Sequence, residues 1–313
     1  MEQGWGVTVA GSAKGRFHSP VNNKMLMLAA RCRNLVFAAC VLLLVLPASA
    51  SEIITREFRS ATLQRSWAYN VYLPSGYERS SLSFPVLYLL HGNGGTRDDW
   101  VQKGRIQRTA DSLIARREIP PTIIVMPDAG VSWYVDRREK METAIIRDLL
   151  SDVEQNLRAL KSRDGRLIAG LSMGGYGALR FALKYPEMFA AAALLSPAIY
   201  DPLPPSNSSA RTVGTFGEPG FDERVWKSLN YPALWQGYLV KGITVPMYIH
   251  SGDDDEFRTE AEAARLYSLL RAHEQPAELR IVDGTHSWTV WENAVGEAMK
   301  YIFSFVAKPT SSE

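Results

Sequence analysis

The stretch RLIAGLSMGGYGALRFALKY, residues 166–185, decides the fold of this chain. It opens with an apolar run at 167–171, typical of a buried strand, and continues after a tight turn as an apolar helix. The turn has the pattern G-x-S-x-G, with Ser172 between Gly170 and Gly174. The sequence therefore places one serine hydroxyl on a sharp turn between a predicted strand and a predicted helix.

The chemistry of a nucleophile explains the two glycines. A serine raised on a tight, strained turn leaves no room for a side chain two positions away, so Gly170 and Gly174 avoid a clash. The same turn directs the N-terminus of the next helix at Ser172, where N–H groups and the helix dipole favour a developing oxyanion. In this strand–turn–helix context, the pattern predicts the nucleophile elbow of an α/β-hydrolase.

The first fifty residues differ in composition from the rest of the chain. An unbroken apolar run of twelve, 35–46, follows several basic residues and precedes the small-residue exit PASA, which ends at Ala50. This pattern predicts a secretory signal peptide over 1–50, cleaved after Ala50. The run is too short for a spanning helix, which needs about 20 residues. We therefore expect a periplasmic or secreted product with no stable membrane anchor after cleavage.

Removal of this leader changes the charge and the cysteine content. The chain holds 35 basic and 33 acidic side chains, of which five basic and one acidic lie in 1–50, so the remainder carries 30 and 32. The formal charge goes from +2 to −2, which argues against a nucleic-acid partner. Cys32 and Cys40 both lie in the leader, so the mature chain offers no disulfide, thiol nucleophile or cysteine metal site.

Strands alternate with helices along most of 51–313, after two initial strands at 53–58 and 67–73. This alternation predicts a single α/β-hydrolase domain: a mainly parallel central sheet with two antiparallel strands at its front edge, flanked by helices. The pattern breaks over 200–242, which we interpret as an irregular, cap-like insertion near the active site. The later strands are expected at 84–90, 122–126, 167–171, 189–195, 245–250 and 277–282, and the helices at 105–117, 142–160, 259–272 and 289–306.

A serine nucleophile needs a base to take its proton and a third group to orient that base. In α/β-hydrolases these residues follow in the order Ser, acid, His. His286 lies in DGTHSWTVW, between the last predicted strand and the last predicted helix, where this fold needs its base. His91 precedes the nucleophile, and we expect it to organise a loop instead.

The acid is expected in SGDDDEF, directly after the strand at 245–250. Three adjacent aspartates repel one another and cannot all be buried, so one should face the base while the others cap the next helix or stay solvated. Asp255 is the preferred candidate for the acid, Asp254 is the main alternative, and Asp253 is the third aspartate of the run. A cation site here is an alternative, but a short acidic run is more often solvated surface, and we expect no metal and no cofactor.

An oxyanion hole needs one N–H from the residue after the nucleophile and one from the loop after an earlier strand. Met173 supplies the first. HGNGG at 91–95 follows a predicted buried strand, and the Asn93 amide is the candidate for the second. The position of this loop, upstream of the elbow, distinguishes it from an ordinary turn.

Five blocks of the chain resemble, in order, those of the Putative esterase family. They are LYLLHGNGGTRDDW, IVMPDAGVSWYVD, AGLSMGGYGALRFALKYPEMFAAAALLSPAI, SGDDDEF and GTHSWTVWENAV, and they cover roughly 55–306. The family contains esterase D-type S-formylglutathione hydrolases, secreted feruloyl and acetyl-xylan esterases, enterochelin esterases and antigen 85 mycolyltransferases. The resemblance implies Ser172 as nucleophile, His286 as base and, through the pattern G-x-x-D, Asp255 as acid.

The same resemblance implies further site residues. Asn93 and Met173 match the oxyanion positions, although the family often has an apolar residue where this chain has Asn93. Trp133, Tyr134 and Trp288 match aromatic positions near the mouth of the pocket, where they would bind substrate. Core packing is the alternative for these aromatic side chains.

The resemblance and the leader together imply an exported serine esterase that hydrolyses carboxylic esters through a Ser-His-Asp acyl-enzyme mechanism. Export argues against a formylglutathione substrate, which is cytosolic, and favours a small-molecule or carbohydrate-linked ester. Acyl transfer of the mycolyltransferase type and a non-catalytic exported binding protein on the same fold are the alternatives. Specificity is expected in 200–242, whose aromatic residues either line a pocket or pack the insertion: Phe216, Phe221, Trp226 and Trp235.

Overall fold

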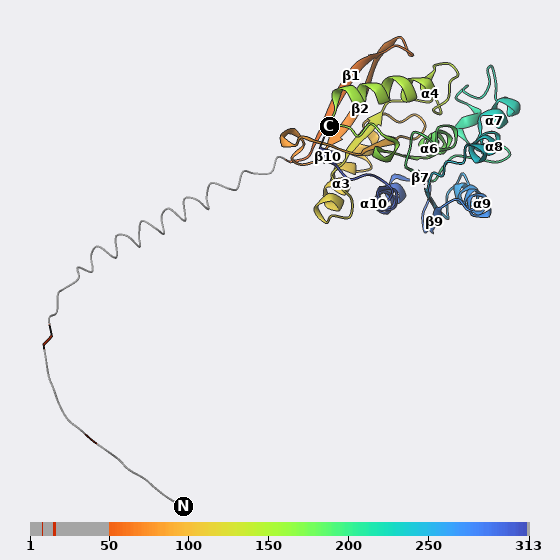
Figure 1. Ribbon diagram of the computed structural model, residues 1–313. Coiled ribbons are helices and arrows are strands. Elements are labelled where there is room, and N and C mark those ends of the chain that lie inside the picture. Colours follow the sequence, from red (N-terminus) through yellow and green to blue (C-terminus); the bar gives the residue numbers. More distant parts are fainter. Residues whose placement is uncertain (1–7, 9–14, 17–49, 312–313) are drawn as a thin grey trace, which may run out of the picture. The chain divides into compact units, whose positions relative to one another are not determined.

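The central sheet holds eight strands in the order β1-β2-β5-β4-β6-β7-β8-β9 (Figure 1). The computed structural model describes Thr8, Gly15, Arg16 and residues 50–311. β1 pairs antiparallel with β2 and β2 antiparallel with β5, while the other neighbours pair parallel, which confirms the predicted sheet. The strands are β1 (Glu52–Ser60), β2 (Arg65–Leu73), β4 (Val86–Leu90), β5 (Ile123–Pro127), β6 (Arg166–Leu171), β7 (Ala191–Leu195), β8 (Met247–Gly252) and β9 (Ala277–Val282), with β3 (Leu82–Ser83) and β10 (Thr310–Ser311) as a separate pair.

The predicted signal peptide over 1–50 falls almost entirely outside the described residues and stays a prediction. Residues Ser49–Glu313 form one compact unit. Within the described part of the chain, no helix is both long enough and apolar enough to cross a membrane.

Helices cover both faces of the sheet. α3 and α10 pack against one face, and α5, α6 and α9 pack against the other. Figure 1 shows α3 and α10 next to each other, and the two helices are in contact. The helices are α2 (Asp99–Gln102), α3 (Ile106–Ala115), α4 (Met141–Thr143), α5 (Leu150–Asn156), α6 (Met173–Lys184), α7 (Glu223–Leu229), α8 (Tyr231–Lys241), α9 (Thr259–Ala272) and α10 (Trp288–Phe303).

The apolar strands are buried because both faces of the sheet are covered. All five residues of β4, VLYLL, are buried. Successive side chains of a strand point to opposite faces, so Tyr88 joins the core under α6 while Leu87 joins the core under α10. β6, at the centre between β4 and β7, thus ends at the middle of the sheet's carboxyl edge, where Ser172 follows it.

The helix predicted over 142–160 is shorter and less regular than expected. α4 leads into a π-helical segment, Ala144–Leu149, and then into α5, which ends at Asn156. Residues beyond this point are extended because their backbone pairs with another segment: the Phe84 N–H donates to the Arg158 carbonyl, and the Leu160 N–H donates to the Phe84 carbonyl. Tertiary pairing therefore ended the helix where the apolar periodicity alone would have continued it.

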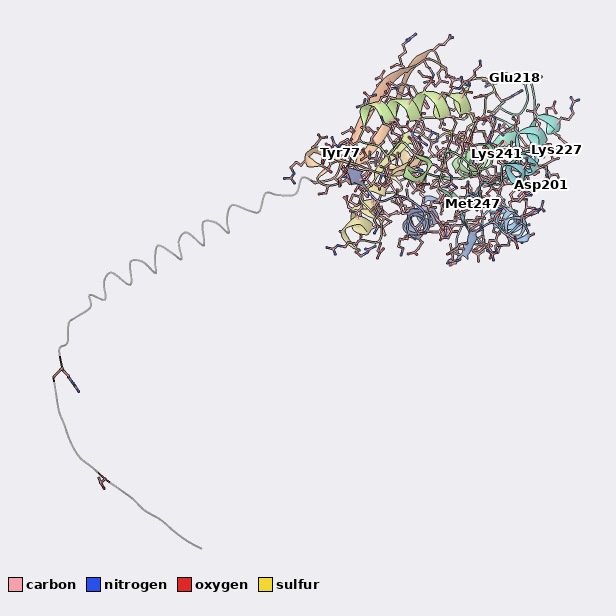
Figure 2. The ribbon with its side chains drawn as sticks, viewed as in Figure 1. Tyr77, Asp201, Glu218, Lys227, Lys241 and Met247 are labelled. Carbon is pink, nitrogen blue, oxygen red and sulfur yellow. The ribbon has the colours of Figure 1, made fainter. Side chains whose placement is uncertain are left out.

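The predicted insertion at 200–242 holds a short 3₁₀ helix, η4 (Ser209–Arg211), together with α7 and α8. α8 packs on α6, the helix that follows Ser172. Figure 2 shows Glu218, Lys227 and Lys241 at the α7–α8 end of the molecule. Phe216 and Trp226 are fully buried with ring centroids 4.7 Å apart, so these two aromatic residues pack the insertion down.

Candidate active site

The turn after β6 holds Ser172 in a conformation that few non-glycine residues adopt. Its φ is 52° and its ψ is −116°. A Cβ at Gly170 would lie 2.4 Å from the Gly174 backbone, and a Cβ at Gly174 would lie 2.5 Å from the Leu90 carbonyl oxygen. The glycines of G-x-S-x-G are therefore required by close backbone approach, as the sequence predicted.

A series of hydrogen bonds joins the three predicted catalytic side chains. His286 Nε2 lies 2.8 Å from Ser172 Oγ, and His286 Nδ1 lies 2.6 Å from Asp255 Oδ2. Ser172 follows β6, Asp255 follows β8 and His286 precedes α10, so three loops at one edge of the sheet contribute one residue each. This arrangement lets the imidazole take a proton from the hydroxyl while the carboxylate holds the opposite nitrogen.

Asp255 is the aspartate of its run that the structure brings to the imidazole. Its side chain is buried, whereas Asp253 and Asp254 are exposed. Burial by itself would raise the pKa of Asp255, but hydrogen bonds from His286, Thr259 and the Phe257 N–H outweigh it and hold that pKa below its usual value. The carboxylate is thus kept ionised inside the protein.

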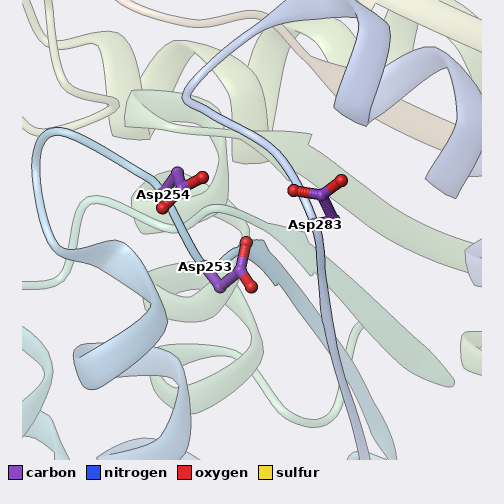
Figure 3. A group of neighbouring side chains, drawn as sticks. All are labelled: Asp253, Asp254 and Asp283. Atoms are coloured by element: carbon purple, nitrogen blue, oxygen red, sulfur yellow. The ribbon is translucent and has the colours of Figure 1, made fainter.

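The remaining acidic side chains of this loop form a separate group. Carboxylate oxygens of Asp253, Asp254 and Asp283 lie within 4.8 Å of one another, and all three residues are exposed (Figure 3). The Gly284 N–H donates to Asp253 Oδ1 at 3.1 Å, which joins the loop after β8 to the loop after β9. The group faces solvent, and exposed acidic groups are common without an ion.

Two aromatic rings hold the imidazole of His286 between them. Phe257 and Trp291 meet it edge-on, with ring centroids 4.8 Å and 4.9 Å from that of His286. Trp291 is fixed in turn, because its indole N–H donates to Ser196 Oγ at 3.0 Å. Neither Phe257 nor Trp291 was predicted as a site residue. Trp291 could have been found from its position three residues after Trp288, on the same face of a helix.

The loop at 91–95 lies where the second oxyanion donor was expected. Asn93 is exposed on the wall of the pocket that holds Ser172, and Met173, the other predicted donor, is the first residue of α6. The N–H groups of the first turn of a helix have no partner within the helix, so the Met173 N–H is available to a ligand. The structure therefore places Asn93 on the wall of the Ser172 pocket, and Met173 in the turn directly after Ser172.

His91 organises this loop, as the sequence predicted. Its imidazole is buried, Nε2 accepts the Ala129 N–H at 2.9 Å, and Nδ1 lies 2.6 Å from the Gly92 carbonyl oxygen. Because Nε2 accepts, the proton resides on Nδ1 and donates to that carbonyl. Burial lowers the pKa of His91, which is consistent with this neutral form.

The pocket around Ser172 has a volume of about 550 Å³. Trp288, predicted to bind substrate, lines it together with His286 and Trp291. Most of its other wall is polar, and part of that wall comes from the insertion. The polar lining residues besides the catalytic pair are Asn93, Asp99, Lys103, Asn207, Ser209 and Thr212.

The prediction that Trp133 and Tyr134 bind substrate is corrected by the structure. Both side chains are fully buried in the core and do not line the Ser172 pocket. Trp133 packs edge-on against Tyr176, and the Tyr134 hydroxyl donates to the His91 carbonyl at 2.9 Å. Both residues have positive φ angles, 55° and 56°, and Tyr134 supports the site through its contact with His91.

Comparison with known proteins identifies the family of this chain. The Esterase family model, described as "Putative esterase", matches residues 60–302. "Esterase Rv1288" of Mycobacterium tuberculosis (strain ATCC 25618 / H37Rv) is 41% identical over 145 residues, which cover 44% of this chain and 30% of that protein. An "Endo-1,4-beta-xylanase/feruloyl esterase" of Xylanibacter ruminicola is 33% identical over 155 residues, covering 46% of this chain and 21% of that protein. The chain thus spans well under half the length of these two curated relatives.

Among solved structures, a ferulic acid esterase superposes with a TM-score of 0.68 at 27% sequence identity. The alignment covers 82% of this chain and 99% of that structure. The predicted α/β-hydrolase fold is confirmed by this likeness and by the sheet order. Since the family model spans most of the chain, we conclude that this protein belongs to the Putative esterase family.

Proposed function

We propose that this chain is an exported serine esterase that hydrolyses carboxylic esters through a covalent acyl-enzyme. The observation that carries the proposal is the hydrogen-bonded series Ser172–His286–Asp255, with separations of 2.8 Å and 2.6 Å. Membership in an esterase family supports the same class of reaction.

In the first half of the reaction, Ser172 Oγ attacks the ester carbonyl carbon while His286 Nε2 takes the hydroxyl proton. His286 Nδ1–H donates a hydrogen bond to the Asp255 carboxylate, which leaves the Nε2 lone pair facing the serine. The Met173 and Asn93 N–H groups would stabilise the negative oxygen of the tetrahedral intermediate. The alcohol then leaves with the proton that His286 returns.

In the second half, a water molecule gives its proton to His286 Nε2 and attacks the acyl-enzyme carbonyl. The intermediate collapses, the acid product leaves, and Ser172 recovers its proton. Each step uses side chains and backbone groups of this chain, and the proposal calls for no cofactor.

The walls of the pocket favour an ester that carries polar groups. Asp99 and Lys103, which line it, form an ion pair at 3.1 Å, and Asn207 of the insertion lines it as well. A long alkyl chain against this wall would displace water from these charged and amide groups without replacing its hydrogen bonds, which costs free energy. The names of the xylanase/feruloyl esterase and ferulic acid esterase relatives support a carbohydrate-linked or small aromatic ester as the substrate class.

Export rests on the leader pattern over 1–50. Expression of the full chain in a bacterial host with separate recovery of periplasm and cytoplasm tests it. Mass spectrometry of the recovered protein should give an N-terminus at Ser51. A cytoplasmic product that retains the leader would contradict this part of the proposal.

Initial hydrolysis rates on p-nitrophenyl esters from acetate to palmitate test the reaction. We expect the highest rates on the short esters, and we expect Ser172→Ala to lose at least about a thousandfold in kcat. Ser268→Ala, an exposed serine on α9, is the matched control and should behave as wild type.

Labelling by a fluorophosphonate distinguishes the esterase from an acyltransferase and from a non-catalytic binding protein. Labelling of wild type but not of Ser172→Ala, with hydrolysis, supports the esterase. Labelling without hydrolysis of any ester until a sugar acceptor is added would favour acyl transfer. Folded wild type that neither hydrolyses nor labels would overturn the enzyme proposal in favour of a binding protein.

A further inference from the structure

A second strained residue lies beside the turn that carries the nucleophile. Ser196 follows β7 and has a φ of 41°, in the left-handed region that few non-glycine residues adopt. Ser172 follows the neighbouring strand β6 and has a φ of 52°, so the two strained serines follow paired strands. Strain of this kind persists only where the surrounding structure holds it, and it clusters at active sites.

The segment around Ser196 holds the backbone of the nucleophile on both sides. The Ser172 N–H donates to the Leu195 carbonyl at 2.9 Å, and the Ala198 N–H donates to the Ser172 carbonyl at 3.1 Å. The Ser196 N–H donates to the His250 carbonyl at 2.6 Å, which ties the segment to β8. Because Leu195 directly precedes Ser196, a shift of the Ser196 backbone would also move the nucleophile.

The hydroxyl of the same residue is connected to the base. Ser196 is fully buried, and its Oγ accepts the Trp291 indole N–H at 3.0 Å. The Trp291 ring packs against the His286 imidazole, with centroids 4.9 Å apart and planes at 88°. Asp255 holds Nδ1 of the imidazole, so the ring needs support from the side to keep Nε2 2.8 Å from Ser172 Oγ. The indole gives this support, and the Ser196 hydroxyl fixes the orientation of the indole.

We propose that Ser196 is a positioning residue for ester hydrolysis, an inference that rests on the proposed function. Ser196 is buried and does not line the Ser172 pocket, so it acts through other residues. Its hydroxyl acts on the base through Trp291, and its backbone acts on the nucleophile through Leu195. A misplacement of about 1 Å between reacting groups can lower a rate about a hundredfold. The Ser196 hydroxyl therefore contributes to the rate of the reaction and not to the binding of the ester.

The rate of labelling by a fluorophosphonate tests this role, because the reagent reacts with the same serine–histidine pair. Ser196→Ala removes the acceptor of the indole N–H and should slow labelling by about 10- to 100-fold. On p-nitrophenyl acetate, kcat and kcat/KM should fall together, with little change in KM.

Ser60→Ala is the matched control. Ser60 is also fully buried, and its Oγ accepts the Leu63 N–H at 3.0 Å, but it lies at the end of β1 and does not line the Ser172 pocket. This variant loses a similar buried hydrogen bond and should label at the wild-type rate.

Two further variants separate the hydroxyl from the backbone. Trp291→Phe keeps an aromatic ring without the N–H and should slow labelling about as much as Ser196→Ala; the double variant should be slower than either by less than about threefold. Ser196→Gly also lacks the hydroxyl but adopts a φ of 41° without strain. It should therefore resist urea better than Ser196→Ala and yet label at least as slowly.

The outcomes distinguish this inference from the proposed function. Wild type that does not label would overturn both together. Labelling of Ser196→Ala or of Trp291→Phe at the wild-type rate would overturn the inference alone. The same conclusion would follow if Ser60→Ala slowed as much as Ser196→Ala, if Ser196→Gly restored the rate, or if the losses of the two single variants multiplied in the double variant.

Discussion

Asp255 illustrates how one residue combines burial with charge. The protein surrounds its carboxylate with hydrogen-bond donors, including the Phe257 N–H at 2.9 Å and the Thr259 hydroxyl. Thr259 Oγ1 lies 2.8 Å from Ser251 Oγ, so a second hydroxyl fixes the donor. The carboxylate can therefore orient His286 without moving toward solvent.

Replacing this acid by an amide tests its orienting role. The side-chain amide introduced by Asp255→Asn can donate to Nδ1 of His286 and so place the proton on Nε2, where it blocks acceptance from Ser172. We expect this substitution to lower kcat by about four orders of magnitude, with little change in KM. Asp254→Asn, at the exposed neighbour, is the control and should retain wild-type rates; an equal loss in both variants would reject the assignment of Asp255.

His250 makes stability depend on pH. Burial lowers its pKa from 6.5 to about 4, so between these values the unfolded chain binds a proton that the folded chain does not. The free energy of unfolding should therefore fall as the pH decreases through this window, by about 3 kcal/mol from this residue. Above 6.5 the contribution is complete, and below 4 it is lost.

Urea denaturation at several pH values measures this effect. The decrease in unfolding free energy from about pH 7 to about pH 4.5 should be smaller in His250→Leu than in wild type, because leucine does not titrate. His273→Gln, which removes an exposed histidine, is the comparison variant. Identical pH profiles for wild type and His250→Leu would contradict the neutral, buried histidine.

At the scale of an element, the turn between β6 and α6 depends on the absence of a side chain. Gly170→Ala would place a Cβ 2.4 Å from backbone atoms that cannot move without displacing Ser172. We expect a loss of more than about 3 kcal/mol in unfolding free energy, or failure to fold. Gly237→Ala on α8 meets nothing within 4 Å and should gain about 0.5–1 kcal/mol. Urea denaturation compares the two, and equal effects would contradict the proposed cause.

A buried ionic network joins α4, α6 and the insertion. Arg180 Nε donates to Glu142 Oε2 at 2.7 Å and its Nη1 donates to the Leu229 carbonyl at 2.6 Å, while Lys184 also pairs with Glu142. Burial would raise the pKa of Glu142, but Arg180 and its other partners hold that pKa below the usual value. The network thereby anchors the end of α7 to α6, the helix that follows Ser172.

Removing the carboxylate of this network should lower the free energy of unfolding. Glu142→Gln leaves the Arg180 guanidinium buried without its carboxylate, and we expect about 3–5 kcal/mol lower unfolding free energy. Glu223→Gln, which breaks the exposed Glu223–Lys227 pair on α7, should change it by less than about 1 kcal/mol. Urea denaturation that gives similar small losses for both would show that the buried network contributes little.

At the scale of the whole molecule, local pattern predicted the sheet, the elbow and the order of Ser172, Asp255 and His286. These features could be predicted because each depends on a short run of residues in a fixed place along the chain. For Trp133 and Tyr134 the sequence could not decide between the pocket and the core, since a loop sequence does not reveal the direction in which its rings point. The burial of His250 also escaped prediction, because it depends on how the strands and a distant helix pack together.

Ser172 and His286 are 114 residues apart in the chain, and they meet only when β6, β8 and the start of α10 are in register. The hydrolysis rate therefore reports on the cooperativity of unfolding, because a chain whose sheet has unfolded retains no catalytic activity. We expect the loss of hydrolysis of p-nitrophenyl acetate in urea to follow the same transition as far-ultraviolet circular dichroism. Inactivation at clearly lower urea would mean that the loops after β8 and β9 open as a unit of their own before the rest of the molecule.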